Sequence, residues 1–315
     1  MKAAVYKEYG PPEVVHIMEI DKPAPTPGEL LVRVHASTLT AGDWRLRRAS
    51  PFLARLYNGL LRPKKVNILG WELAGRVEAI GEGVSRFKVG DDVFAWTGMG
   101  FGAHAEYRCI PEASRRAQDG VVALQPKNLS HQEAAAVPVG GLSAQAFITT
   151  AGLKSGQSIL IYGASGSVGT YAVQLAKNLG TQVTGVCSTT NLELVSALGA
   201  DRVIDYTVED ITSAGQTYDV VFDAVGKLSS SRARRILRKG GKFVTVRSAP
   251  GRIELDVLDR LKDLLEAGQL RVVIDRCYPL EEVVRAHEYV ERGHKKGNVI
   301  ITMPTAPPLV ATYSP

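Results

Sequence analysis

The stretch "QSILIYGASGSVGTYAVQLAKNLG", residues 157–180, decides the fold. An apolar run ends at Tyr162, three glycines follow at a spacing of three residues, and a helical pattern begins directly after them. A strand, such a glycine loop and a helix in this order are typical of a dinucleotide-binding unit. Without a Cβ the backbone can touch a pyrophosphate, whose charge is favoured at the N-terminus of a helix. The predicted cofactor-binding residues of this loop are Gly163, Ser165, Gly166, Ser167, Val168 and Gly169.

The residues after the loop alternate between strand and helix patterns up to about residue 248. Runs with apolar centres, such as "QVTGVCS" at 182–188 and "YDVVFDAVG" at 218–226, are separated by helical segments. This alternation predicts βαβ units and a parallel sheet, and right-handed crossovers make that sheet doubly wound.

The N-terminal part has a different pattern. From residue 1 to about 123, short β-rich runs such as "ELLVRVHAS" at 29–37 are broken by Gly and Pro, which favours a compact β-barrel-like domain. Residues 51–62 place apolar side chains at helical spacing, and we expect this stripe to be core or a pocket lid rather than a helix lying on a membrane. The chain then ends in helix, strand, helix and strand patterns, and 304–315 is predicted to be a loose tail.

Composition limits the class of protein. The 315 residues, 45% hydrophobic and 22% charged, fit a globular protein of about two domains, without an apolar run long enough to span a membrane. No signal-peptide pattern opens the sequence, so we expect a cytoplasmic location. The three cysteines lie far apart and are expected to be reduced packing residues. The net charge is +6, and basic residues are concentrated in two segments without Asp or Glu, 45–65 and 224–253. These segments are predicted to be solvated faces.

The end of the second strand of the nucleotide-binding unit indicates the coenzyme. An NAD site usually has an acidic residue there to bind the ribose 2′-hydroxyl. Here the strand ends in Cys187, Ser188, Thr189, Thr190 and Asn191, whose hydroxyls and amide can donate to a 2′-phosphate. NADP(H) is therefore predicted, with Arg202 or another distant base completing the phosphate site.

From Met1 to about Met303 the sequence resembles the medium-chain dehydrogenase/reductase superfamily, in particular its zinc-independent quinone oxidoreductase branch. The resemblance rests on "HASTLTAGDWRLR" (35–47), "LGWELAGRVEAIGEGV" (69–84), "YGASGSVG" (162–169), "VIDY" (203–206) and "KKGNVIIT" (295–302). It implies a GroES-like β-barrel catalytic domain, residues 1–123 and 266–303, with a Rossmann NADP-binding domain, residues 124–265, inserted between them. It also implies that Ser143, Tyr206, Gly226 and Asn298 line the cofactor groove and that Ser188 faces the adenosine ribose.

Two positions depart from the zinc enzymes of this superfamily. Where those enzymes have a cysteine and a histidine as zinc ligands, this sequence has Thr40 and Trp71. Tetrahedral zinc needs thiolate, imidazole or carboxylate donors, and indole offers none, so no metal is predicted. Without a Lewis acid, alcohol oxidation is disfavoured, whereas reduction of a quinone or an activated C=C bond stays feasible.

The resemblance suggests roles for the residues around this turn. We expect Trp44 and Trp71 to wall a flat apolar substrate pocket, and Thr40 or Arg45 to hydrogen-bond the enolate or quinolate oxygen while solvent delivers the last proton. Asp43 is expected to fix the loop through backbone hydrogen bonds and a pair with Arg47.

The segment after Gly241 is shorter than is usual in the family. About 27 residues separate Gly241 from Gly268, so we expect the nucleotide-binding sheet to lack one strand and the protein to be a monomer or a weakened dimer.

Two alternatives to the reductase remain open at this point. One is a low-turnover NADPH-binding protein that acts as a nucleic-acid-binding or interaction module through its basic segments, although nucleic acid is the less favoured partner. The other is a membrane-associated protein that uses residues 51–62.

Overall fold

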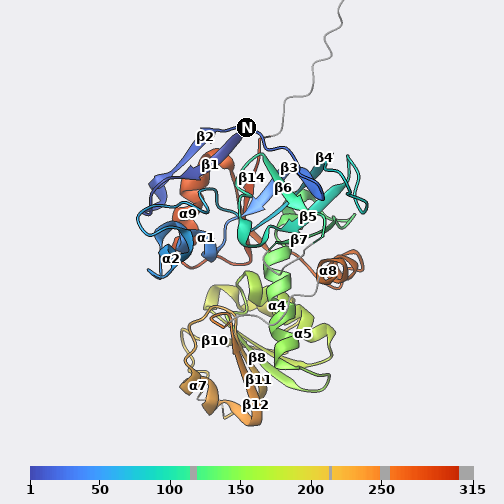
Figure 1. Ribbon diagram of the computed structural model, residues 1–315. Helices are drawn as coiled ribbons and strands as arrows, with labels where there is room; N and C mark the ends of the chain where they lie inside the picture. Colours follow the sequence, from blue (N-terminus) through green and yellow to red (C-terminus); the bar gives the residue numbers. More distant parts are fainter. Residues whose placement is uncertain (114–118, 213–214, 249–255, 305–315) are drawn as a thin grey trace, which may run out of the picture.

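The structure, a computed structural model, describes residues 1–113, 119–212, 215–248 and 256–304. Figure 1 shows a β-rich half, which holds both the first and the last strand, above a smaller α/β half formed by the middle of the chain. The nucleotide-binding sheet and its helices therefore form an insertion within the β-rich half. The two halves agree with the predicted combination of a GroES-like β-barrel with a Rossmann sheet.

The β-rich half is built around a seven-stranded sheet of order β13-β14-β3-β4-β5-β7, with β6 also paired to β3 and a separate β1-β2 hairpin. Alternate side chains of its strands point into an apolar core that includes Leu30, Val32, Leu73 and Ile301. The strands are β1 (Lys2–Tyr6), β2 (Val15–Glu19), β3 (Glu29–Thr38), β4 (Glu72–Ile80), β5 (Asp92–Trp96), β6 (Tyr107–Pro111), β7 (Val121–Leu124), β13 (Ile274–Pro279) and β14 (Asn298–Thr302). The helices of this half are α1 (Ala41–Arg48), α2 (Ala54–Asn58) and α9 (Val283–Glu291).

The nucleotide-binding half has a parallel sheet, in which the described residues form five strands in the order β10-β9-β8-β11-β12. Its central strands are almost fully buried because helices cover both faces. The strands are β8 (Ser158–Tyr162), β9 (Gln182–Cys187), β10 (Arg202–Asp205), β11 (Tyr218–Asp223) and β12 (Leu237–Thr245). The helices are α4 (Pro138–Ala151), α5 (Ser167–Asn178), α6 (Leu192–Ala197), α7 (Ser230–Arg235) and α8 (Val257–Glu266), and the short α3 (His131–Ala135) that precedes them contacts β3, β4 and β5 of the barrel half.

The connection between the halves begins with a capping box, which the spacing of Ser130 and Glu133 in the sequence predicts. The Ser130 hydroxyl accepts from the amide of Glu133, whose carboxylate accepts from the Ser130 amide, and α3 starts there. Pro138 has no N–H to continue α3, but it suits the first turn of a new helix, so α4 begins at that residue. Helix α8 then contacts both β7 and α4. The boundaries at 123/124 and 265/266 stay predictions, and 305–315 of the predicted tail lies outside the described residues.

Several sequence expectations were wrong in detail. The helix expected at 51–62 is reduced to α2. Five of its apolar side chains are exposed rather than core, whereas Tyr57 lines an apolar pocket, as part of the expectation allowed. The sequence "SSRARRILRKGG", residues 230–241, predicts a helix up to Gly241, but the helix ends at Arg235, because Leu237 pairs with Tyr218 and starts β12. Cys187 is buried as expected and Cys109 is half-buried, whereas Cys277 is exposed, and all three are free thiols.

Candidate active site

The glycine loop, residues 163–169, links β8 to α5 at the carboxyl end of the parallel sheet. Gly163 has a φ of +81°, and a Cβ there would approach Val225 Cγ1 to 2.5 Å. At Gly169 a Cβ would lie 2.1 Å from the carbonyl oxygen of Gly163, so only glycine lets α5 pack this closely on the loop. These two glycines are required by the protein's own packing.

Gly166 is different, because a Cβ there would meet only the Gly163 carbonyl oxygen, at 3.5 Å. Gly166 is also the N-cap of α5, and no side chain caps this helix end. The loop residues Ser165, Ser167 and Val168 are only half-buried. Free amides, a positive helix end and open space beside Gly166 suit a pyrophosphate, so the residues present fit a dinucleotide.

The glycine loop is bound to the last strand of the barrel. The amide of Gly297 donates to the Ser165 carbonyl at 2.8 Å, and Gly166 and Gly297 form a parallel bridge. Ser167 Oγ donates to Asn298 Oδ1 at 2.6 Å, while the Asn298 side-chain amide reaches the Val273 carbonyl at 3.2 Å. The predicted residues Ser167 and Asn298 therefore lie together, and Asn298 holds the seam between the two halves.

The part of the site that would distinguish NADP(H) from NAD(H) lies directly after β9. Ser188 is half-buried, and its hydroxyl accepts from the Asn191 side-chain amide at 3.0 Å. The neighbouring Thr189 donates to Asp205 Oδ2 at 2.5 Å. Hydrogen bonds from Thr189 and then from Thr207 hold the pKa of Asp205 below its usual range. The sequence did not predict Asp205 as part of this site, because Asp205 belongs to the neighbouring strand β10. Only the strand pairing, which places Asp205 beside Cys187, shows that it lies here.

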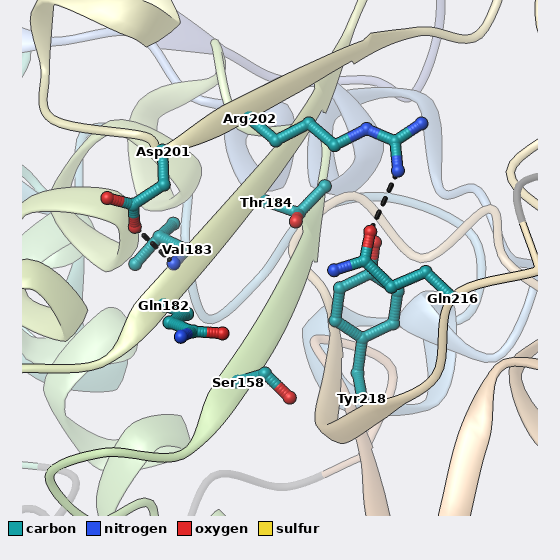
Figure 2. Close-up of a pocket in the computed structure, with 8 residues that line it drawn as sticks. All are labelled: Ser158, Gln182, Val183, Thr184, Asp201, Arg202, Gln216 and Tyr218. Carbon is teal, nitrogen blue, oxygen red and sulfur yellow. Dashed lines mark hydrogen bonds between the residues drawn. The ribbon is translucent and has the colours of Figure 1, made fainter.

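Arg202, proposed from the sequence as a distant base for the 2′-phosphate, does not reach Ser188. It starts β10, three residues before Asp205, which places it about 10 Å further along the strand. Figure 2 shows its guanidinium bonded to Gln216, at 2.8 Å, in a hollow of about 220 Å³ at the amino ends of β8, β9, β10 and β11. The cofactor loops follow the carboxyl ends of the strands, so this hollow belongs to the opposite edge of the sheet.

Gly226, predicted to line the groove, lies in a turn that Asp223 organises. The carboxylate of Asp223 is fully buried and accepts from the amides of Gly226 at 2.8 Å and Leu228 at 2.9 Å. This turn touches the glycine loop through Val225. Tyr206, which was also predicted to line the groove, is 47% exposed, and its ring centroid lies 6.1 Å from that of Tyr162.

The last of these, Ser143, is half-buried on α4, one turn after Gly140. A Cβ at Gly140 would lie 2.9 Å from Ser167 Oγ. Helix α4 therefore passes directly beside the start of α5, and Ser143 lies one turn beyond this contact on α4.

An apolar pocket of about 190 Å³ opens beside Trp71 in the barrel half. The indole of Trp71 packs edge-on against Phe101, with ring centroids 4.6 Å apart, and its Nε1 is buried without a partner among the described residues. Trp44, expected as the second wall, is not among the lining residues and packs partly buried against the barrel core, with the Arg45 guanidinium 5.5 Å from its ring centroid. The lining residues are Gly42, Arg45, Leu46, Ser50, Pro51, Ala54, Tyr57, Trp71, Met99 and Phe101.

Thr40 caps α1 next to this pocket. Its hydroxyl donates to Asp43 Oδ2 at 2.6 Å, and the other carboxylate oxygen of Asp43 accepts from the amide of Gly70 at 2.8 Å. The loop role predicted for Asp43 is thus confirmed. Its predicted pair with Arg47 was wrong, because the buried Arg47 pairs with Glu291 of α9 at 2.6 Å.

Glu72, directly after Trp71, is the buried carboxylate that the sequence reasoning left without a role. It accepts from the Thr38 hydroxyl and, at 2.6 Å, from the backbone amide of Val139 in α4. Burial raises the pKa of Glu72 to about 7. Burial likewise lowers the pKa of Lys295 to about 8, against the opposing effect of the Glu72 charge. Two groups that titrate near neutrality therefore lie where the barrel meets α4.

The described residues contain no group of three or more His, Cys, Asp or Glu side chains placed to hold a metal ion. His104, near Thr40 and Trp71, contacts the Thr38 carbonyl through Nε2 at 2.9 Å. In the basic segment 224–253, Arg232 pairs with Asp210 and Arg238 with Asp219, both at 2.7 Å, so acids from other elements neutralise part of its charge.

A doubly wound sheet with an open glycine loop, joined to a barrel with an apolar pocket, is the arrangement of a dinucleotide-dependent oxidoreductase. The family descriptions "alcohol dehydrogenase GroES-like domain" and "zinc-binding dehydrogenase" match residues 26–117 and 167–272, and a second zinc-binding dehydrogenase description matches 247–301. The chain belongs to the medium-chain dehydrogenase/reductase superfamily.

Named relatives are similar over almost the whole chain. It is 34% identical to 2-methylene-furan-3-one reductase of Solanum lycopersicum, with 96% of this chain and 79% of the relative covered. It is 32% identical to the chloroplastic quinone-oxidoreductase homolog of Spinacia oleracea, covering 96% and 98%. Among solved structures, the quinone oxidoreductase from Coxiella burnetii matches with a TM-score of 0.82 and 28% identity, covering 96% and 99%.

Proposed function

We propose that this protein is an NADPH-dependent reductase that delivers hydride to a quinone or an α,β-unsaturated carbonyl without a zinc ion. The observation that carries this proposal is the open backbone at Gly166 in the same molecule as an apolar pocket walled by Trp71. The relatives named as a furanone reductase and as quinone oxidoreductases support the substrate class. A further relative is named as an NADPH-dependent alkenal/one oxidoreductase, which supports the coenzyme.

The chain's own residues would hold the cofactor at three places. The amides at the start of α5 bind the pyrophosphate, Ser188 and Asn191 meet the adenosine ribose, and Ser143 lies toward the nicotinamide end. Bound NADPH supplies the hydride. The protein contributes position and an apolar surrounding that keeps water away from the acceptor.

The oxygen of the acceptor becomes negatively charged when hydride adds to the conjugated system. Arg45 is exposed and lines the pocket, so its guanidinium can stabilise that oxygen. Thr40 is less free to donate, because its hydroxyl already bonds to Asp43. Solvent then adds a proton to the enolate or quinolate, which completes the reduced product.

NADPH oxidation measured against a panel of quinones and enones, with NADH in parallel, tests the proposal directly. We expect turnover with NADPH and at least one class of acceptor, and weaker turnover with NADH. Equal turnover with a simple primary alcohol and NADP⁺, dependent on added zinc, would contradict it.

Location and assembly are also proposals. A cytoplasmic location stays a proposal, and several relatives are named as chloroplastic or mitochondrial. The five strands that the described residues contribute to the nucleotide-binding sheet support a monomer or a weakened dimer. Light scattering that finds a tight dimer would count against this.

A further inference from the structure

Five large apolar side chains project from one short stretch of the barrel half. We call them the outer apolar segment; their exposed fractions are 63% for Phe52, 67% for Leu53, 72% for Leu56, 56% for Leu60 and 86% for Leu61. Six other large hydrophobic residues are exposed in the described part of the chain, and they are scattered over other elements. Single exposed apolar residues are ordinary, but five within ten residues mark a surface that meets an apolar partner.

The base of this segment is firmly attached to the barrel. Asn58 is fully buried, and its side chain bonds to the Tyr6 hydroxyl at 2.8 Å and to both backbone groups of Val66. Tyr57 donates to the Met99 carbonyl at 2.8 Å, and Tyr9 donates to the Gly59 carbonyl at 2.7 Å. The bonds of Asn58, Tyr57 and Tyr9 thus fix the base of the segment, so the outward apolar side chains are the consequence of a specified local structure.

The stretch of sequence that holds the outer apolar segment carries only basic charges, although two of them, Arg47 and Arg48, pair with Glu291 of α9. Residues 45–65 contain seven Lys or Arg and no Asp or Glu. Arg62, Lys64 and Lys65 are exposed, and no described carboxylate lies within 4.0 Å of any of them. An apolar surface with unpaired cations beside it is complementary to a lipid bilayer, which has an apolar interior and can carry anionic headgroups.

We propose that the outer apolar segment docks this protein on an anionic lipid bilayer, with Leu53, Leu56 and Leu61 entering the interface and the basic residues meeting the headgroups. No helix of the described chain is long and apolar enough to cross a membrane, so the contact is peripheral. A protein partner of mixed charge would leave these cations unpaired, whereas anionic headgroups neutralise all of them.

The segment is also one wall of the apolar pocket. Pro51, Ala54 and Tyr57 line it, opposite Trp71. When the segment lies on a bilayer, the pocket therefore lies beside the hydrocarbon phase. If the proposed reductase function holds, a quinone or enone dissolved in lipid reaches the pocket without crossing water; the docking itself does not depend on that function.

Co-sedimentation of the full chain with vesicles tests the docking without any assay of turnover. The probes are vesicles of phosphatidylcholine alone and of phosphatidylcholine with phosphatidylglycerol, each at low and high salt. We expect binding to the anionic vesicles, and a fall of about tenfold or more in partitioning for the triple variant L53S/L56S/L61S. The matched control V89S/V208S changes two residues that are 58% and 82% exposed elsewhere, and it should bind like the wild type.

A second pair of variants separates charge from apolar area. R62Q/K64Q/K65Q should lose the preference for anionic vesicles, while K154Q/R234Q/K239Q, which removes the same charge from other exposed sites, should keep it. Failure of the wild type to bind anionic vesicles would overturn the proposal, as would equal binding by the leucine variant with its melting curve unchanged. So would a self-associated wild type that the leucine changes dissociate without any vesicle binding, because a second copy would then cover the segment.

Discussion

The carboxylate of Glu72 accepts a hydrogen bond from the backbone amide of Val139 at 2.6 Å, and this contact joins strand β4 of the barrel to the first turn of helix α4. A negative charge at this end of a helix is favourable, but full burial opposes it. The balance leaves the pKa of Glu72 near 7, so the contact between the two halves of the protein changes its charge near neutral pH.

Glu72→Gln should alter how stability depends on pH. Because the folded pKa lies above the ordinary value of 4.5, the folded state holds its proton more tightly than the unfolded state. This contribution is present below about pH 4.5 and is lost as the pH rises toward 7, by roughly 3 kcal/mol. Urea unfolding at pH 5 and pH 8 should therefore show a smaller change for Glu72→Gln than for the wild type. Parallel pH dependences would show that Glu72 does not titrate in this range.

The two glycines of the cofactor loop should respond differently to alanine. Gly166→Ala places its methyl group in open space, so folding is retained, but NADPH binding should weaken by about tenfold because the methyl group occupies the pyrophosphate position. Gly169→Ala collides with the Gly163 carbonyl and should destabilise the fold by about 2–3 kcal/mol. Fluorescence titration with NADPH, together with thermal melts, separates the two effects. Unchanged NADPH affinity in Gly166→Ala would show that the pyrophosphate does not bind beside Gly166.

Ser188→Asp should reverse the coenzyme preference. The new carboxylate repels a 2′-phosphate and accepts from a 2′-hydroxyl, so kcat/KM should fall with NADPH and rise with NADH. Ser188→Ala is the control, since it removes the hydroxyl without adding charge and should reduce use of NADPH only slightly. Because Asp205 already lies near this place, bonded to Thr189, the wild-type preference is expected to be moderate.

The two tryptophans provide a matched pair for the substrate pocket. Trp71→Ala removes one wall and should raise KM for flat aromatic quinones by about tenfold, through loss of 1–3 kcal/mol of apolar contact. Trp44→Ala, outside the lining, should leave KM nearly unchanged. Steady-state kinetics of both variants with one quinone decides the matter, and the opposite ranking would place the substrate against Trp44.

Glu291→Gln should destabilise the barrel half. It leaves the Arg47 guanidinium, whose side chain is fully buried, without its anionic partner, which costs about 3 kcal/mol. The pKa of Glu291 is lowered by hydrogen bonds from Arg47 and Arg48 in spite of its burial, so this stabilisation is present above about pH 4.5 and is lost as the pH falls below that. Glu288→Gln on the same helix is the control. Thermal melts at pH 7 that coincide for the two variants would contradict this.

The sequence predicted the features that depend on neighbouring residues. The strand, loop and helix around Gly163–Gly169, the capping box at Ser130 and the loop role of Asp43 all follow from short spacings and were found. The apolar pattern at 51–62 was misleading, because helical spacing reports a common side of a helix but not whether anything covers that side.

What the sequence could not predict comes from pairing across the fold. Asp205 reaches Thr189 because β9 and β10 are in register, and Arg47 meets Glu291 because α1 packs on α9. The sequence spacing cannot identify Glu291 as the partner of Arg47, because more than two hundred residues separate them. It cannot identify Asp205 as the partner of Thr189 either, because the register between β9 and β10 is not fixed by the sequence of either strand alone. The raised pKa of Glu72 likewise depends on burial that only the assembled halves provide.

The contacts of Gly297 and Asn298 with Ser165 and Ser167 also concern the order of events on the ribosome. The nucleotide-binding segment leaves the exit tunnel while the strand that completes its loop has yet to be translated. Until β14 has been translated and has paired with the glycine loop, the nascent chain has the nucleotide-binding sheet but an incomplete coenzyme-binding site. We therefore expect the coenzyme to bind late in the biogenesis of this protein.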